Sequence, residues 1–180
     1  SSARLAVKAK IVMPRPTPTI KVDAVRQLGG EVVLAGDSFD EAKAHALELA
    51  ENEGLTYVAP FDDPMVIAGQ GTIGLELIQD AADVNRIFVP VGGGGLAAGI
   101  AVLVKQLMPQ VKIIGVEPAE SACLAAAMEA GEPVTLDRVS LFAEGVVVAR
   151  IGDETFRILK DHLDDVVTVD SDEISAAVKD

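Results

Sequence analysis

Four consecutive glycines, Gly92 to Gly95, separate an apolar run, Arg86–Val91, from a helix-like stretch, Leu96–Lys105. The pattern predicts a strand, a tight turn and the start of a helix. Because these four residues have no Cβ, the chain can turn sharply and bring several backbone N–H groups to the positive end of the helix dipole. Such a turn is typical of an anion site, and phosphate is the usual anion.

Short runs rich in Val, Ile and Leu alternate with longer helical patterns along the chain. This alternation is typical of β-α units that build a parallel sheet. Strands that are buried on both faces tend to be short and apolar throughout. We therefore predict an α/β fold, with mainly parallel sheets and helices on both faces. The expected strands are Lys10–Met13, Glu31–Ala35, Leu55–Val58, Arg86–Val91, Val111–Glu117 and Asp165–Val169.

Capping residues predict where helices begin and end in the first third of the chain. Ser38 and Glu41 form a capping box, in which the Ser hydroxyl accepts from the amide three residues on and the Glu carboxylate reaches back. Gly54 then ends that helix. Thr19 is placed to cap a second helix over Ile20–Leu28. Both helices lie between expected strands, as β-α units require.

A boundary between domains is expected near Ala59–Pro64, where two prolines bracket acidic residues. The helix-like run that follows, Met65–Asp80, carries Gly69, Gly71 and Gly74. Each glycine weakens a helix by roughly 1 kcal/mol relative to alanine. We expect these glycines to allow close packing against a neighbour.

The composition limits the partners of the chain. Its 180 residues are 49% hydrophobic and carry a formal net charge of −13, with no cluster of Lys and Arg. Binding to nucleic acid or to an anionic membrane is therefore not expected, and a small-molecule partner is. Cys123 is the only cysteine, which excludes an intramolecular disulfide and favours a reducing, cytoplasmic location. No apolar segment is long enough to span a bilayer.

Two nucleotide-binding motifs are alternative interpretations of the glycine run. A Walker A loop is excluded, because Gly-Lys-Ser/Thr does not occur. Gly93, Gly95 and Ala98 do satisfy the Gly-x-Gly-x-x-Gly/Ala fingerprint of dinucleotide sites, and Glu117 follows where a ribose-binding acid is expected. That fingerprint normally opens on the first strand, whereas three expected strands precede this one. Phosphate binding is favoured, and an NAD-binding oxidoreductase module stays open as the alternative.

The segment Val89–Leu96 resembles the phosphate loop of the fold-type II pyridoxal-phosphate (PLP) enzymes, the tryptophan synthase β family. The likeness covers nearly the whole chain. Four further segments are similar to the biosynthetic threonine deaminases (L-threonine ammonia-lyases) within that family. They are Ile20–Arg26, Asp40–Lys43, Pro60–Thr72 and Ser140–Val146.

The resemblance implies a cofactor, a reaction and a domain plan. It assigns the phosphate of pyridoxal 5'-phosphate to Gly92, Gly93, Gly94, Gly95 and the backbone of Leu96. It implies conversion of L-threonine to 2-oxobutanoate and ammonia, the first step of isoleucine biosynthesis, in a homo-oligomer. Residues 1–58 would belong to a small mobile domain and residues 59–180 to a larger one that binds the PLP phosphate. Within the family, an L-serine deaminase or racemase stays open.

The resemblance also shows what this chain lacks. In the family, a lysine that holds the cofactor as a Schiff base precedes a Ser-Ala-Gly-Asn-His-type loop, and neither motif occurs here. We therefore expect an internal fragment of the catalytic domain, assign no catalytic residue, and expect the 180 residues alone to be inactive. Threonine-dependent 2-oxobutanoate formation by the purified chain would refute that expectation. The lysines without a matching context are Lys8, Lys10, Lys21, Lys43, Lys105, Lys112, Lys160 and Lys179.

The remaining polar residues are not expected to bind a ligand or to catalyse a reaction. Glu117 and Ser121 fall where some relatives, including serine racemases, bind a divalent cation, but Cys123 stands in place of the second acid. One carboxylate with a hydroxyl is a poor cation site, so no metal is expected and Glu117 is treated as an ordinary polar strand end. Cys123 is expected to be a small buried residue rather than a nucleophile. Solvated positions are expected for His45, His162, Asp62 and Asp63.

Overall fold

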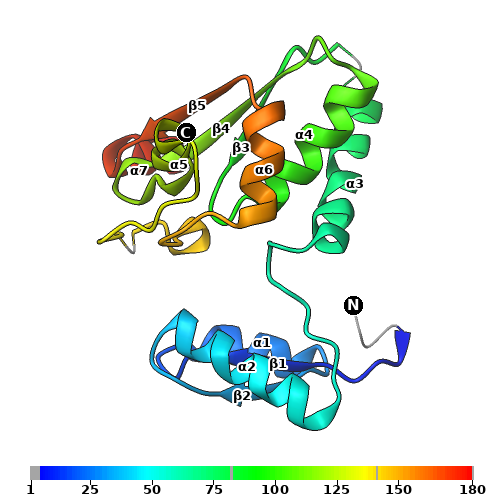
Figure 1. The fold of residues 1–180 in the computed structure, drawn as a ribbon, viewed down its shortest axis with the longest axis vertical. Coiled ribbons are helices and arrows are strands. Elements are labelled where there is room, and N and C mark those ends of the chain that lie inside the picture. The colour runs from blue at the N-terminus through cyan, green and yellow to red at the C-terminus, as the bar shows by residue number, and fades with distance from the viewer. Residues whose placement is uncertain (1–4, 82, 141, 180) are drawn as a thin grey trace. The chain divides into compact units, whose positions relative to one another are not determined.

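A computed structural model describes residues 5–81, 83–140 and 142–179 of the chain. Residues 1–57 and 58–180 form two compact units, which Figure 1 draws as ribbons coloured along the sequence. The boundary expected from the sequence, between residues 58 and 59, falls next to this division. The assignment of the two units to a small mobile domain and a larger cofactor-binding domain stays a prediction.

The first unit is built from β1 (Lys10–Met13), α1 (Thr19–Gln27), β2 (Glu31–Leu34) and α2 (Phe39–Glu53). The two strands pair in parallel, with Lys10 opposite Glu31, and α1 connects them. Val22, Ala35 and Ala42 supply the buried apolar side chains. Lys10 Nζ donates to the Glu53 carboxylate at 2.7 Å, which ties β1 to the end of α2.

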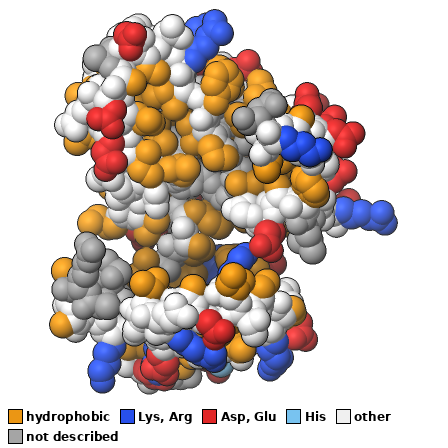
Figure 2. All heavy atoms as spheres, turned by 180° about the vertical axis from the view of Figure 1, so that it is seen from behind, with side chains coloured by type: hydrophobic (Ala, Val, Ile, Leu, Met, Phe, Trp, Pro, Cys, Tyr) orange, Lys and Arg blue, Asp and Glu red, His pale blue; other side chains and the backbone are white. Residues whose placement is uncertain are grey.

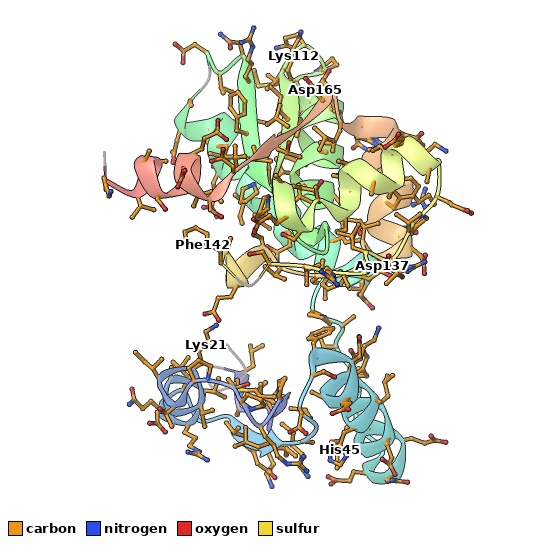
Figure 3. All side chains as sticks on the ribbon, turned by 90° about the vertical axis from the view of Figure 1, so that its left-hand side faces the viewer. Lys21, His45, Lys112, Asp137, Phe142 and Asp165 are labelled. Atoms are coloured by element: carbon orange, nitrogen blue, oxygen red, sulfur yellow. The ribbon has the colours of Figure 1, made fainter. Side chains whose placement is uncertain are left out.

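The second unit contains a parallel sheet in the order β3-β4-β5. Its strands are β3 (Arg86–Pro90), β4 (Lys112–Pro118) and β5 (Asp165–Val169). Figure 3 shows Lys112 and Asp165, the first residues of β4 and β5, at one edge of the unit. Because the strands are parallel, the glycine run after β3 lies at the opposite edge, where the strands end. Ligands of open α/β sheets bind at that edge.

The helices of the second unit are α3 (Pro64–Asp80), α4 (Gly95–Leu107), α5 (Cys123–Ala130), α6 (Asp153–His162) and α7 (Ser171–Lys179). Two short 3-10 turns, η2 (Ala119–Ser121) and η3 (Glu144–Val146), lie between them. One core cluster unites the sheet with α3 to α6. It includes Val89, Val104, Ile113, Leu124 and Leu159. None of the helices in the described part of the chain is long and apolar enough to cross a membrane.

The predicted fold class is confirmed: the chain is α/β with parallel sheets. The capping residues of α2 are also largely as predicted. Ser38 Oγ accepts from the Glu41 amide at 3.2 Å, and Gly54 ends the helix at a φ of 66°. The Glu41 carboxylate accepts from the amide of Asp37 at 2.6 Å rather than from that of Ser38.

Two predictions about local structure are wrong. Residues Leu55–Val58 form no strand, because no neighbouring strand among the described residues pairs with them; Leu55 is 44% exposed and Val58 70%. Thr19 is the first residue of α1 and not its cap. Pro18, with a φ of −55°, occupies the cap position and offers no side-chain acceptor.

Candidate functional site

The glycine run joins the end of β3 to α4, whose first residue is Gly95, so the predicted strand, turn and helix are present. Gly94 has a φ of +92°, in the left-handed region that glycine adopts without steric strain, and serves as the N-cap of α4. The first amides of a helix have no partner within the helix and point out of its N-terminus. Among the described residues, none accepts a hydrogen bond from the amides of residues 92 to 97.

The loop is packed so closely that its neighbours fill the positions a Cβ would take. A Cβ on Gly92 would lie 2.8 Å from the Val146 carbonyl oxygen. One on Gly94 would lie 2.9 Å from Thr155 Oγ1, and one on Gly93 would overlap the ring of Phe61. The glycines are therefore required for packing on one side of the loop. The free amides supply the anion-binding groups, so the residues present fit a phosphate.

A second helix N-terminus lies beside the loop, and Asp62 occupies it. The Asp62 carboxylate accepts from the amides of Asp153 (3.0 Å), Glu154 (3.0 Å) and Thr155 (3.2 Å) at the start of α6. The first turn of α6 is thus satisfied within the protein, whereas no described residue accepts from the first amides of α4. An anion therefore has one helix N-terminus open to it here.

The sequence led us to expect solvated turn positions for Asp62 and Asp63, but both carboxylates accept hydrogen bonds from helix amides. Asp63 is the N-cap of α3, and its carboxylate accepts from the amides of Met65 (2.8 Å) and Val66 (3.2 Å). The local signal was present, because an Asp before a Pro at the first helical position is a common helix start. No local signal marks Asp62, whose partners lie about ninety residues further along the chain.

Glu117 is also more than an ordinary polar strand end. It is 0% exposed, and its two carboxylate oxygens accept from the amides of Leu124 and Ala125, each at 2.8 Å, at the start of α5. Burial raises the pKa of this carboxyl group, and the two amides oppose that shift. The carboxylate is committed to α5 and is not free to bind a ribose.

Cys123 is buried, as predicted, at 0% exposure. Burial, followed by the nearby charge of Glu117, raises the pKa of its thiol to about 12, so a thiolate nucleophile is disfavoured at neutral pH. Its Sγ lies 3.7 Å from the carbonyl oxygen of Gly92, which connects α5 to the glycine loop. The part of the chain that the structure describes contains no group of three or more His, Cys, Asp or Glu side chains able to hold a metal ion.

The two histidines lie on helices, His162 on α6 and His45 on α2. His162 Nδ1 contacts the Ile158 carbonyl oxygen at 2.8 Å within α6, and His45 pairs with Glu48 on α2 at 3.9 Å. Both are partly buried. On the face drawn in Figure 2, Lys and Arg side chains are scattered among acidic and apolar ones and form no continuous basic surface.

The family model described as "Pyridoxal-phosphate dependent enzyme" matches residues 1–180, the whole of the chain. The chain belongs to this family. Membership confirms the resemblance of the chain to PLP enzymes that was inferred from the glycine loop and the other segments. Together with the buried, engaged carboxylate of Glu117, it makes the dinucleotide alternative wrong. The individual phosphate-binding residues, Gly92 to Gly95 and Leu96, are consistent with the loop geometry and stay a prediction.

Relatives within the family narrow the comparison. The chain is 68% identical over 180 residues to the biosynthetic L-threonine dehydratase of Salmonella typhimurium, covering 100% of this chain and 35% of that protein. It matches the solved structure of processed threonine deaminase isoform 2 from Solanum lycopersicum at 54% identity and a TM-score of 0.94, covering 98% of this chain and 52% of that one. Maize serine racemase matches with a TM-score of 0.94 at 32% identity, covering 99% and 54%. The chain thus spans about a third of the length of its curated relatives.

Proposed function

We propose that the protein produced from the complete gene is a PLP-dependent L-threonine ammonia-lyase of the biosynthetic type. It would convert L-threonine to 2-oxobutanoate and ammonia, as the first step of isoleucine biosynthesis. The observation that carries this proposal is the 68% identity to a biosynthetic threonine dehydratase along all 180 residues. A homo-oligomeric state and a cytoplasmic location stay predictions.

The glycine loop is the proposed phosphate site of the cofactor. The backbone amides of Gly92 to Gly95 and of Leu96 would donate to the phosphate oxygens, and the positive end of the α4 dipole would offset part of the phosphate charge. When bound, PLP supplies an electron sink that stabilises negative charge at the substrate Cα. The loop contributes by fixing the phosphate and therefore the orientation of whatever is attached to it.

No residue of this chain is proposed as the catalytic base. Cys123 is buried with a raised thiol pKa, and Glu117 is bound by the first turn of α5. Asp62 is likewise held by three amides of α6. The carboxylates of Glu117 and Asp62 thus stabilise the starts of α5 and α6. The group that moves the Cα proton is proposed to be the Schiff-base lysine of the family, for which this chain has no matching segment.

The activity is tested with the purified protein from the complete gene. We expect L-threonine to yield 2-oxobutanoate and ammonia, measured by a coupled absorbance assay, with kcat/KM higher than for deamination of L-serine to pyruvate. The similarity of the fold to maize serine racemase makes serine chemistry the second candidate. Formation of D-serine on chiral analysis, with no 2-oxobutanoate from L-threonine, would replace the first proposal by the second.

A further inference from the structure

Thr155 lies directly behind the glycine loop, in the first turn of α6. Its side chain is 0% exposed, and Oγ1 lies 2.7 Å from the carbonyl oxygen of Gly93 and 3.2 Å from that of Gly152. A hydroxyl has one proton to donate, and the shorter contact identifies Gly93 as its main acceptor. The amide of Gly152 approaches the same Gly93 oxygen at 3.4 Å. The Gly93 carbonyl is therefore held toward α6.

Holding this carbonyl fixes the direction of the next amide. In a planar trans peptide the C=O of one residue and the N–H of the next point in opposite directions. Among the described residues no peptide bond is cis. The Gly94 N–H must therefore point away from α6, on the side of the loop opposite Thr155. No acceptor for that N–H is found among the described residues.

Thr155 is itself held in place from two directions. Its backbone amide donates to Asp62 Oδ1 at 3.2 Å, as part of the cap on α6. Its β-branched side chain has few rotamers and is enclosed in the core. Glycine peptides, by contrast, rotate easily, and a run of four has little stiffness of its own. The rigid start of α6 can thus impose one orientation on a flexible loop.

We propose that Thr155 is a positioning residue for the phosphate of the cofactor. Its hydroxyl holds the peptide between Gly93 and Gly94 so that the Gly94 N–H faces the phosphate before the cofactor arrives. The inference rests on the proposed function, since it presumes that the glycine loop binds the PLP phosphate. It assigns a role to a residue outside the loop, which the glycine pattern does not reveal.

The test compares PLP with pyridoxal, which lacks the phosphate, as ligands of the apoprotein made from the complete gene. Thr155→Val keeps the shape of the side chain without its hydroxyl. In this variant we expect PLP affinity to fall about tenfold, as for loss of the hydrogen bond from the Gly94 N–H to the charged phosphate. Pyridoxal affinity should change less than about twofold. Dissociation constants are measured by absorbance titration. Thr155→Ser is expected to restore the preference for PLP.

Controls separate positioning from structural damage. Thr72→Val removes a hydroxyl that donates to the Gly69 carbonyl at 2.9 Å within α3, and should leave both affinities unchanged. If Thr155→Val does not fold, Thr155→Ala and Thr155→Ser form a second pair, because both lose the methyl group and only the first loses the hydroxyl. The preference for PLP over pyridoxal should then fall in the Ala variant alone.

Each outcome separates the two proposals. If the ratio of PLP affinity to pyridoxal affinity in Thr155→Val were the same as in the wild type, the role of Thr155 would be overturned. The proposed phosphate site would not be affected by that result. A wild-type protein that binds pyridoxal as tightly as PLP would instead overturn the phosphate site itself.

Discussion

At Gly99, α4 approaches α3 so closely that no side chain fits between them. A Cβ there would overlap the carbonyl oxygen of Ile67 and lie 2.6 Å from the amide nitrogen of Gly71. Both are backbone atoms, which cannot move aside as a flexible side chain can. Gly74 lies in the same interface, where a Cβ would meet Val104 at 3.3 Å. The expected close packing is therefore present at Gly71 and Gly74, but Gly69 faces open space.

This contrast predicts opposite effects of the same substitution. Gly99→Ala should lower the free energy of unfolding by roughly 1–3 kcal/mol, because α3 and α4 would have to separate. Gly69→Ala, in open space on α3, should raise it by up to about 1 kcal/mol through helix propensity. Urea denaturation followed by circular dichroism measures both. Equal effects of the two variants would contradict the close packing at Gly99.

At the scale of elements, four helices of the second unit, α3, α5, α6 and α7, begin on carboxylates. Asp63 caps α3, Glu117 caps α5 and Asp62 caps α6. Asp170 and Glu173 form a reciprocal capping box at α7, each accepting from the other's amide at 2.8 Å. The first turn of α4, capped by Gly94, has no such carboxylate. This distribution leaves α4 as the helix N-terminus where a phosphate is expected.

The cap on α6 gives a prediction at this scale. Asp62→Ala should lower the free energy of unfolding by roughly 1–2 kcal/mol, because three amides at the start of α6 lose their acceptor. Asp137→Ala is the matched control: Asp137 is exposed on the segment between α5 and α6 (Figure 3). Thermal unfolding with both variants measures the difference. Equal melting temperatures for the two would show that the Asp62 contacts contribute nothing to stability.

The elements also show how far sequence reasoning reaches. The parallel α/β plan, the glycine loop and the caps at Ser38 and Gly54 follow from local patterns, and the structure contains them. The prediction of a strand at Leu55–Val58 is wrong, because a strand depends on a pairing partner that local composition does not specify. The caps by Asp62 and Glu117, and the Thr155 contact, join segments distant in sequence, so they could not be read from local spacing.

At the scale of the whole molecule, the two units differ in how much apolar surface they bury. The second has a continuous core that joins three strands to several helices. The first has a two-stranded sheet, with Val22, Ala35 and Ala42 as its buried apolar residues among those described. A two-stranded sheet is marginally stable by itself, and a unit of about 60 residues buries a smaller fraction of its surface on folding than a larger unit does. The two units should therefore open at different free energies.

Hydrogen exchange in the 180-residue chain measures this difference directly. We expect amides of β1 and β2 to exchange through openings of lower free energy than those of β3 and β4, because local stability follows the density of buried apolar contacts. Mass spectrometry of peptides covering each strand gives the two rates under the same conditions. Leu124→Ala, which removes a fully buried side chain, should accelerate exchange in β3 and β4 by lowering the stability of the second unit. If β1 and β2 were protected as strongly as β3 and β4, and Leu124→Ala accelerated all four strands equally, the units would unfold as one cooperative body.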